Sequence, residues 1–428
     1  MKNRIKQYLL AASMCVGLTA CSDFFEPIPG VQFGLDETFA SKQRTEEYLN
    51  NVYSYVREVT DAIHPNTYGG IFTEASLDGA NRWNKTYAEW TNGSFNSASA
   101  QASEYFSKYY QAIAKASTFI QNVDKCTEAA ASTRGKWKSE ARALRAYYYF
   151  ELLRLYGPIP LIGEDPIPLD ASLEELIKER NSVDECVNFI ATELQSAIDS
   201  GDLLQRAGKA NLGRMDVATC MALKAKLYLY WASPLFNGNT DQASVKNKDG
   251  KQLFPQTEDH SKWTQTRDAY ERFMTFATGQ GYKLTEVYTN GKLDPYASCR
   301  AAGEFFTTTW EAVDELIFVK LRDLYDYTYW VCPKFTDFQD TDVTGGGGYY
   351  TTQETVDLFF TKDGLTIEED PGYDKFEGIP GANNFTSGRY YDPNNPSRLY
   401  FDADKSKVLK QWKDREPRFY VNITYSGS

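Results

Sequence analysis

Two stretches of the chain combine aromatic rings with hydrogen-bonding side chains in a loop-like setting. The first runs through residues 78–93, with glycines at positions 79 and 93. An exposed ring offers an apolar face, and polar neighbours can donate and accept hydrogen bonds beside it. Sugars have apolar C–H faces and polar rims, so this mixture favours a carbohydrate-binding surface. The candidate residues here are Asp78, Arg82, Trp83, Trp90 and Asn92.

The second stretch covers residues 323–330, with the sequence DLYDYTYW. Side chains alternate between faces along an extended strand, so an extended segment would place its three tyrosines on one face. A strand packed on a scaffold would have the same pattern, and the pattern leaves both a binding role and a packing role open. The candidate residues here are Tyr325, Tyr327, Tyr329 and Trp330.

No catalytic residue is predicted. The chain contains two histidines and has no G-x-S-x-G, H-E-x-x-H or glycine-rich nucleotide motif. A glycoside hydrolase needs two positioned carboxylates, and the 58 acidic residues leave a secreted helical hydrolase open as an alternative. No cofactor and no metal site are predicted, because the cysteines are scattered without a C-x-x-C pair.

The N-terminus has the pattern of a bacterial lipoprotein signal. Basic residues 2, 4 and 6 precede an uncharged, largely apolar run over residues 8–20, which is too short to span a bilayer. The run ends in Leu-Thr-Ala-Cys, a lipobox in which Cys21 would become the lipidated first residue. We therefore expect a signal peptide over residues 1–20 and a lipidated tether over residues 21–36.

Composition argues against nucleic acid as a partner. The formal net charge is −12, and an acidic surface repels phosphate backbones. No segment after residue 20 reaches the length of a membrane span. The lipid on Cys21 is therefore the membrane attachment that we expect.

Six segments that could position the candidate residues carry apolar side chains at helical spacing. One ends at Gly157 and Pro158, a pair that stops a helix. The motif Ala-Leu-basic-Ala occurs at residues 143–146 and again at 222–225, which indicates stacked tetratricopeptide-type hairpins unless the likeness is chance. The segments are residues 37–59, 101–123, 138–156, 182–199, 214–232 and 262–278.

The aromatic run within the third segment is predicted to pack inside the scaffold. Successive helical residues turn by about 100°, so Tyr147, Tyr148, Tyr149 and Phe150 face different neighbours. Cys220 is expected to be a buried free thiol. From about residue 280 the chain becomes rich in glycine, proline and asparagine, and short extended pieces are expected at residues 316–319 and 419–423.

Four motifs then resemble the SusD/RagB family of nutrient-uptake lipoproteins. They are EARALRAYYYF at residues 140–150 with its exit loop to residue 162, ALKAKLYLY at residues 222–230 followed by ASPLFNG, TQETVDLF at residues 352–359 followed by Asp363 and Gly364, and REPRFY at residues 415–420. With the lipobox, the resemblance covers the whole chain in order. Family members continue beyond the last motif, so we expect this sequence to be incomplete at its C-terminus.

The resemblance implies a mainly α SusD-like fold and a non-catalytic function. Tetratricopeptide-type hairpins over residues 37–280, with ligand loops inserted, would pack against a loop-rich part with short strands over residues 281–428. The family captures glycans at the outer-membrane surface beside a TonB-dependent, SusC-like transporter, and it contacts ligand through the region between its first two long helices. An outer-membrane, lipid-anchored, outward-facing protein is therefore expected. A structural surface lipoprotein without a ligand remains an alternative.

Overall fold

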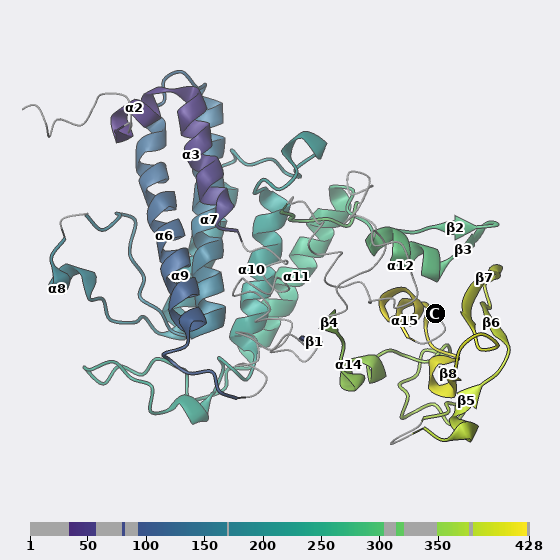
Figure 1. The fold of residues 1–428 in the computed structure, drawn as a ribbon. Coiled ribbons are helices and arrows are strands. Elements are labelled where there is room, and N and C mark those ends of the chain that lie inside the picture. Colours follow the sequence, from purple (N-terminus) through teal and green to yellow (C-terminus); the bar gives the residue numbers. More distant parts are fainter. Residues whose placement is uncertain are drawn as a thin grey trace, which may run out of the picture.

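The computed structural model describes residues 34–56, 79–81, 93–168, 171–303, 314–320, 349–375 and 380–425. Its long helices lie side by side, and each packs on the next along the chain from α6 to α11 (Figure 1). This arrangement confirms the predicted mainly α scaffold of helical hairpins. The scaffold helices are α2 (Leu35–Ala40), α3 (Lys42–Ser54), α6 (Ala100–Asn122), α7 (Ala131–Tyr156), α9 (Val183–Asp199), α10 (Val217–Ala232) and α11 (Ser261–Gly279).

Shorter elements make up the remainder of the described chain. The helices are α8 (Leu173–Leu176), α12 (Pro295–Gly303), α14 (Gln353–Asp357) and α15 (Pro417–Asn422). The strands are β1 (Ala80–Asn81), β2 (Tyr288–Thr289), β3 (Lys292–Leu293), β4 (Tyr349–Tyr350), β5 (Phe385–Thr386), β6 (Arg389–Asp392), β7 (Asn395–Asp402) and β8 (Val408–Leu409). They form four antiparallel pairs, β1–β4, β2–β3, β5–β8 and β6–β7.

Local sequence signals fix the ends of the scaffold helices. Ser182 caps α9 in a capping box with Glu185, and the Asp216 carboxylate accepts the Thr219 amide 2.7 Å away at the start of α10. Gly157 ends α7 with φ +66°, and a Cβ atom there would lie 3.0 Å from Cζ of Phe254. The predicted glycine stop is therefore confirmed, and it has a packing reason as well as a conformational one.

Three expectations about local structure are wrong. The predicted helix 37–59 is two helices, because Ser41 adopts an extended backbone between α2 and α3. The expected extended piece at residues 419–423 lies largely in helix α15, where Pro417 takes the first turn and Phe419 is buried. Residues 316–319 belong to no strand, because they run along the scaffold and contact it through single groups such as the Ile317 carbonyl, which accepts from Thr219.

The aromatic run of α7 lies in the core, as predicted. The rings of Tyr147, Tyr148, Tyr149 and Phe150 are all at least nine-tenths buried. They contact different partners, since Tyr148 stacks near Tyr109 while Phe150 meets Tyr230 edge-on. Cys220 is a buried free thiol, also as predicted. These rings give the scaffold its packing and leave ligand recognition to other residues.

A buried ion pair was not expected from the sequence. Arg145 is fully buried, and its Nε donates to the Glu193 carboxylate 2.8 Å away on α9. Its other nitrogen atoms donate to Ser117 on α6 and again to Glu193, while Arg142 reaches the second Glu193 oxygen at 2.9 Å. The network therefore joins three neighbouring helices through charged hydrogen bonds.

The third and fourth motifs meet through a second buried arginine. Arg415 donates to the carbonyls of Val356 and Phe359 and to the hydroxyl of Tyr373. The backbone of Glu416 also pairs with Phe360, 3.0 Å from amide to carbonyl. Two segments far apart in the sequence are thus held as one unit, and helix α12 packs on α15 beside it.

Candidate functional site

All predicted ligand-binding residues and Cys21 lie outside the described residues. This applies to Asp78, Arg82, Trp83, Trp90 and Asn92 in the first stretch, and to Tyr325, Tyr327, Tyr329 and Trp330 in the second. Their roles therefore stay predictions. The structure does describe the scaffold positions from which both stretches depart and to which they return.

The first shared position is at the end of α3. Lys320 directs its ammonium group at the last turn of this helix, donating to the carbonyl of Val56 at 2.7 Å and to that of Ser54 at 3.1 Å. Val56 is the last described residue before the first candidate stretch, and Lys320 is the last before the second. Described backbone that precedes the two stretches in the chain is therefore joined at one place.

The second shared position is the pairing of β1 with β4. Ala80 lies opposite Tyr350, and Asn81 lies opposite Tyr349, in an antiparallel bridge. In the chain, β1 stands between Asp78 and Arg82, while β4 directly follows the glycine run at residues 345–348. The backbone beside the first set of candidates is thus hydrogen-bonded to β4, which follows the second stretch further along the chain.

A buried polar cluster supports the helix end where the stretches depart. The Tyr53 hydroxyl donates to the Glu140 carboxylate at 2.8 Å and accepts the Met215 amide at 2.8 Å. Arg214 reaches the same carboxylate at 3.2 Å. Burial raises the pKa of Glu140, and the Arg214 charge opposes that rise. The cluster joins α3, α7 and the entry to α10, which makes this end of α3 a fixed support.

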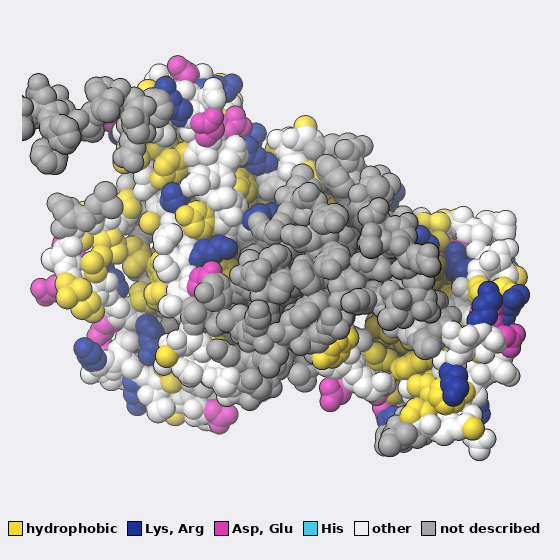
Figure 2. All heavy atoms as spheres, in the orientation of Figure 1, with side chains coloured by type: hydrophobic (Ala, Val, Ile, Leu, Met, Phe, Trp, Pro, Cys, Tyr) yellow, Lys and Arg dark blue, Asp and Glu magenta, His cyan; other side chains and the backbone are white. Residues whose placement is uncertain are grey.

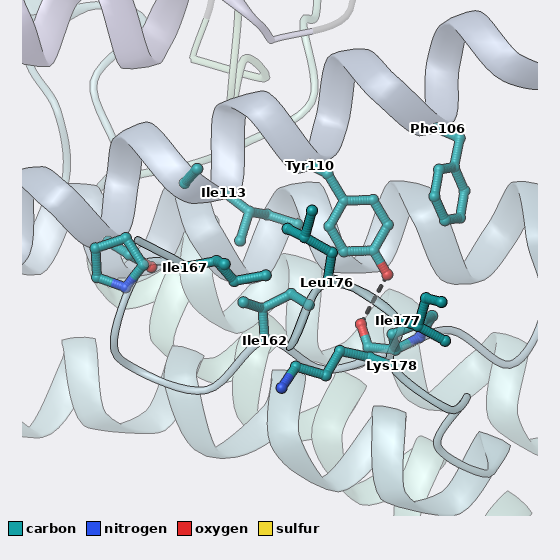
Figure 3. Close-up of a pocket in the computed structure, with 12 residues that line it drawn as sticks. Phe106, Tyr110, Ile113, Ile162, Ile167, Leu176, Ile177 and Lys178 are labelled. Carbon is teal, nitrogen blue, oxygen red and sulfur yellow. Dashed lines mark hydrogen bonds between the residues drawn. The ribbon is translucent and has the colours of Figure 1, made fainter. Parts of the chain in front are cut away.

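A pocket of about 400 Å³ lies elsewhere, between α6 and the chain that links α7 to α9 (Figure 3). Most of its wall is apolar, and the labelled side chains of Ile113, Ile162, Ile167 and Leu176 converge on it. Figure 2 shows hydrophobic side chains gathered over α8, where Leu173 is 72% exposed and Ile177 is 67% exposed. The complete lining is Phe106, Tyr110, Ile113, Ala114, Ser117, Pro160, Ile162, Pro166, Ile167, Leu176, Ile177 and Lys178.

The polar groups of this wall are already used within the protein. The Tyr110 hydroxyl donates to the Pro160 carbonyl at 2.7 Å, and burial raises the pKa of this tyrosine, so it stays a donor. The Ser117 hydroxyl accepts from Arg145 at 3.0 Å. Lys178 is exposed and is the only charged side chain of the lining. The pocket therefore offers hydrophobic contact and little hydrogen bonding.

The sequence analysis missed this pocket, although α6 carries a signal for it. Phe106, Tyr110 and Ile113 recur at spacings of four and three, which places a second apolar stripe beside the stripe that faces the core. Phe106 remains 38% exposed. Proline-bounded apolar residues at 158–168 supply the opposite wall. A helix with two apolar faces signals a second contact surface, but spacing alone does not say what covers it.

Two further observations concern the part of the chain that the structure describes. No cluster of histidine, cysteine, aspartate and glutamate side chains there has the arrangement of a metal site. Among those same residues, no helix combines the length and apolarity of a membrane span.

Two family models match the chain. The model described as starch-binding associating with outer membrane covers residues 32–229, and the SusD family model covers residues 315–428. A SusD-like protein of Bacteroides ovatus is 27% identical over 175 residues, which is 39% of this chain and 30% of that protein.

Solved structures have the same fold. The structure named BT4246 superposes with a TM-score of 0.67 at 23% identity, covering 89% of this chain and 64% of that one. A SusD-like protein from Bacteroides fragilis gives a TM-score of 0.62 at 18% identity, covering 91% of this chain and 62% of that one. The chain thus spans less than two thirds of the length of these relatives.

Proposed function

The chain belongs to the SusD/RagB family, and we propose that it is a surface-anchored, non-catalytic protein that binds oligosaccharides or polysaccharides. The glycan would lie on the two aromatic stretches, with rings stacked on the apolar sugar faces and polar side chains bonded to the hydroxyls. Delivery to a SusC-like transporter completes the proposal, with the lipid on Cys21 holding the protein at the outer membrane.

The single observation that carries this assignment is the shared support of the two stretches. Lys320 contacts the end of α3 at Val56, and β4 pairs with β1. Since Val56 and Lys320 precede the two stretches, and β1 lies within the first while β4 follows the second, these contacts support a single surface formed by both sets of candidates. A binding surface gains affinity when its parts are held before the ligand arrives.

The family description supports the ligand class. A model for starch-binding proteins associated with the outer membrane matches residues 32–229, and this range contains the first candidate stretch. Modest affinity suits such a protein, since a ligand that is handed to a transporter has to be released.

Affinity electrophoresis on defined plant, host and microbial polysaccharides tests the assignment. Trp83→Ala and Trp90→Ala should each weaken retention roughly tenfold, because one ring contact contributes about 0.5–1.5 kcal/mol beyond the area it buries. Trp263→Ala is the matched control: this tryptophan is 42% exposed on α11, outside both stretches. Unchanged retention in both loop variants would remove them from the site.

The same samples separate the proposal from its two rivals. New reducing ends after incubation with a bound polysaccharide would indicate a glycoside hydrolase. Absence of retention on the whole panel would favour a structural surface lipoprotein. Far-UV circular dichroism of each variant checks that the helical scaffold is intact.

A further inference from the structure

We propose that the pocket between α6 and α8 binds one fatty acyl chain, and that this chain belongs to the lipid on Cys21 of the same molecule. The inference rests on the lipid anchor proposed above and is independent of glycan binding. It gives the pocket a ligand class and a source.

The chemistry of the wall selects an alkyl ligand. The hydroxyls of Tyr110 and Ser117 are already hydrogen-bonded within the protein, and the rest of the lining is apolar apart from Lys178 at its edge. An apolar ligand would remove this apolar wall from water, while a sugar would lose hydrogen bonds to water without replacement. A volume of about 400 Å³ also suits a single small ligand.

The place of the pocket in the fold suits a ligand that arrives from the N-terminus. Helix α2 is the first described element, and it is fixed to one end of α6, where Phe39 meets Phe119 and Asp36 pairs with Lys125 at 2.8 Å. The pocket lies along the same helix, and its far wall at Phe106 is about 20 Å from Phe119 at 1.5 Å per residue. Figure 1 shows α2 at one end of α6 and α8 beside it.

The length of the tether matches this span. For the number of residues between positions 21 and 34, a random coil has a root-mean-square length of about 20 Å and a fully extended chain reaches about 45 Å. A tethered ligand has its highest effective concentration, in the millimolar range, when the length of the link matches the distance to the site. The lipid on Cys21 is therefore the acyl chain best placed to enter the pocket.

A tethered acyl chain needs no charged partner at the pocket. Joined to the protein N-terminus as amide or ester it carries no carboxylate, whereas a free fatty acid carries one, which Lys178 is the one charged residue of the lining to meet. The pocket then covers one acyl chain while the protein is away from a bilayer and releases it to the membrane on arrival.

The first experiment tests the pocket with the unlipidated chain that begins at Ser22. Its probe is cis-parinaric acid, a fatty acid that fluoresces when bound in an apolar site, and we expect saturable binding at a single site. Ala114→Trp should weaken this binding at least about tenfold, because the larger side chain fills the pocket from the exposed side of α6. Ala131→Trp, at an exposed alanine of α7, is the matched control and should bind like the unaltered chain. Absence of saturable binding, or equal binding by Ala114→Trp, would overturn the pocket assignment.

The second experiment tests the source with the chain that begins at Cys21, carrying one palmitoyl group on that residue. Self-occupancy should lower probe binding at least about tenfold relative to the unacylated chain, and the protein should remain monomeric by light scattering. Dilution of the palmitoylated chain should leave this loss of probe binding unchanged, because a tethered ligand keeps the same effective concentration at every protein concentration. Undiminished probe binding by the palmitoylated chain, or its self-association, would refute the intramolecular source.

The outcome for glycan binding is read separately. Trp83→Ala and Trp90→Ala should bind the fatty acid probe like the unaltered chain, and Ala114→Trp should retain polysaccharide like it. If fatty acid binding is absent while polysaccharide is retained, the pocket proposal has failed. If polysaccharide is not retained while the fatty acid binds, the glycan proposal has failed.

Discussion

Removal of the Arg145 guanidinium tests how the scaffold is held together. Arg145 is fully buried and donates to Glu193 and Ser117. Breaking a buried pair by removing one partner costs about 3–5 kcal/mol, because the other charge stays buried. In Arg145→Met, Glu193 keeps the Arg142 guanidinium at 2.9 Å, so we expect a loss near the lower end, about 3 kcal/mol.

Removing the Glu193 carboxylate instead of the Arg145 guanidinium should lower the free energy of unfolding further. Glu193→Leu leaves Arg145 without a carboxylate partner among the described residues, since its guanidinium donates to Glu193 and to the Ser117 hydroxyl. We expect a loss near the upper end of the same range, about 5 kcal/mol. The double variant should recover part of the loss, because two apolar side chains replace the pair and no buried charge remains.

Urea unfolding followed by far-UV circular dichroism measures these differences. Lys138→Met is the control: its partner Asp124 is 62% exposed, and such surface pairs contribute about 0–1 kcal/mol. Equal losses in the two single variants would contradict the role assigned to Arg142. Losses below about 1 kcal/mol in both would contradict the claim that the buried pair matters for stability at all.

Three further predictions concern other parts of the chain. Gly157→Ala should lower the free energy of unfolding by about 1–3 kcal/mol in thermal denaturation, because its backbone conformation is nearly restricted to glycine and Phe254 is close; Gly34→Ala, in open space, should change little. Lys251 and the cap at Ser182 lower the pKa of Glu185 to about 2, so its stabilisation is present above the ordinary value of 4.5 and is lost as the pH falls through about 2. Glu185→Gln should therefore lower the free energy of unfolding by about 1 kcal/mol at neutral pH, after allowing for screening at this exposed site, and should not change it below pH 2. Urea unfolding across pH measures this difference. An equal loss of stability at all pH values would contradict the role assigned to the ionised carboxylate. Arg415→Lys should lower the free energy of unfolding by about 2–3 kcal/mol and speed proteolysis of the C-terminal part, since one ammonium group cannot reach the three acceptors. The control is Arg418→Lys: Arg418 is exposed beside Glu416, and this variant should behave like the unaltered chain.

Helical periodicity predicted the scaffold well because burial repeats at each turn. Segments such as residues 182–199 and 262–278 agree with α9 and α11 to within a residue at each end. The glycine after α7 was also readable, since few other residues adopt its conformation. Ser41 is a weaker signal: it is the N-cap residue of α3, but serine also occurs inside helices, so the break between α2 and α3 was not predicted.

The expected extended pieces were less dependable than the helices. An extended piece was expected at residues 419–423, yet the proline at the first turn and the burial of Phe419 produce α15. The Ala-Leu-basic-Ala motif occurs on both α7 and α10, but its basic residue has a different environment in each helix. Arg145 is fully buried, while Lys224 stays partly exposed and donates to Gln195. Partners from other helices decide such roles, and sequence spacing does not contain them.

The candidate site remains the least tested part of the prediction. All its named residues lie outside the described residues, and the division of the chain into signal, tether, scaffold and C-terminal part also stays a prediction. The apolar pocket was missed because its two walls come from α6 and a linking chain some fifty positions later. A contact of that kind depends on how the helices stack.

The double attachment at Val56–Lys320 and β1–β4 has a consequence for how such a protein can diversify. The segment from Lys320 to β4 contains the four candidates of the second stretch, and its two ends are held by Val56 and by β1. When the ends of a segment are already fixed, doubling its length costs only about 0.6 kcal/mol in closure entropy. Insertions between these two ends should therefore change the stability of the helices little, and one scaffold can accept many different sugar-facing surfaces.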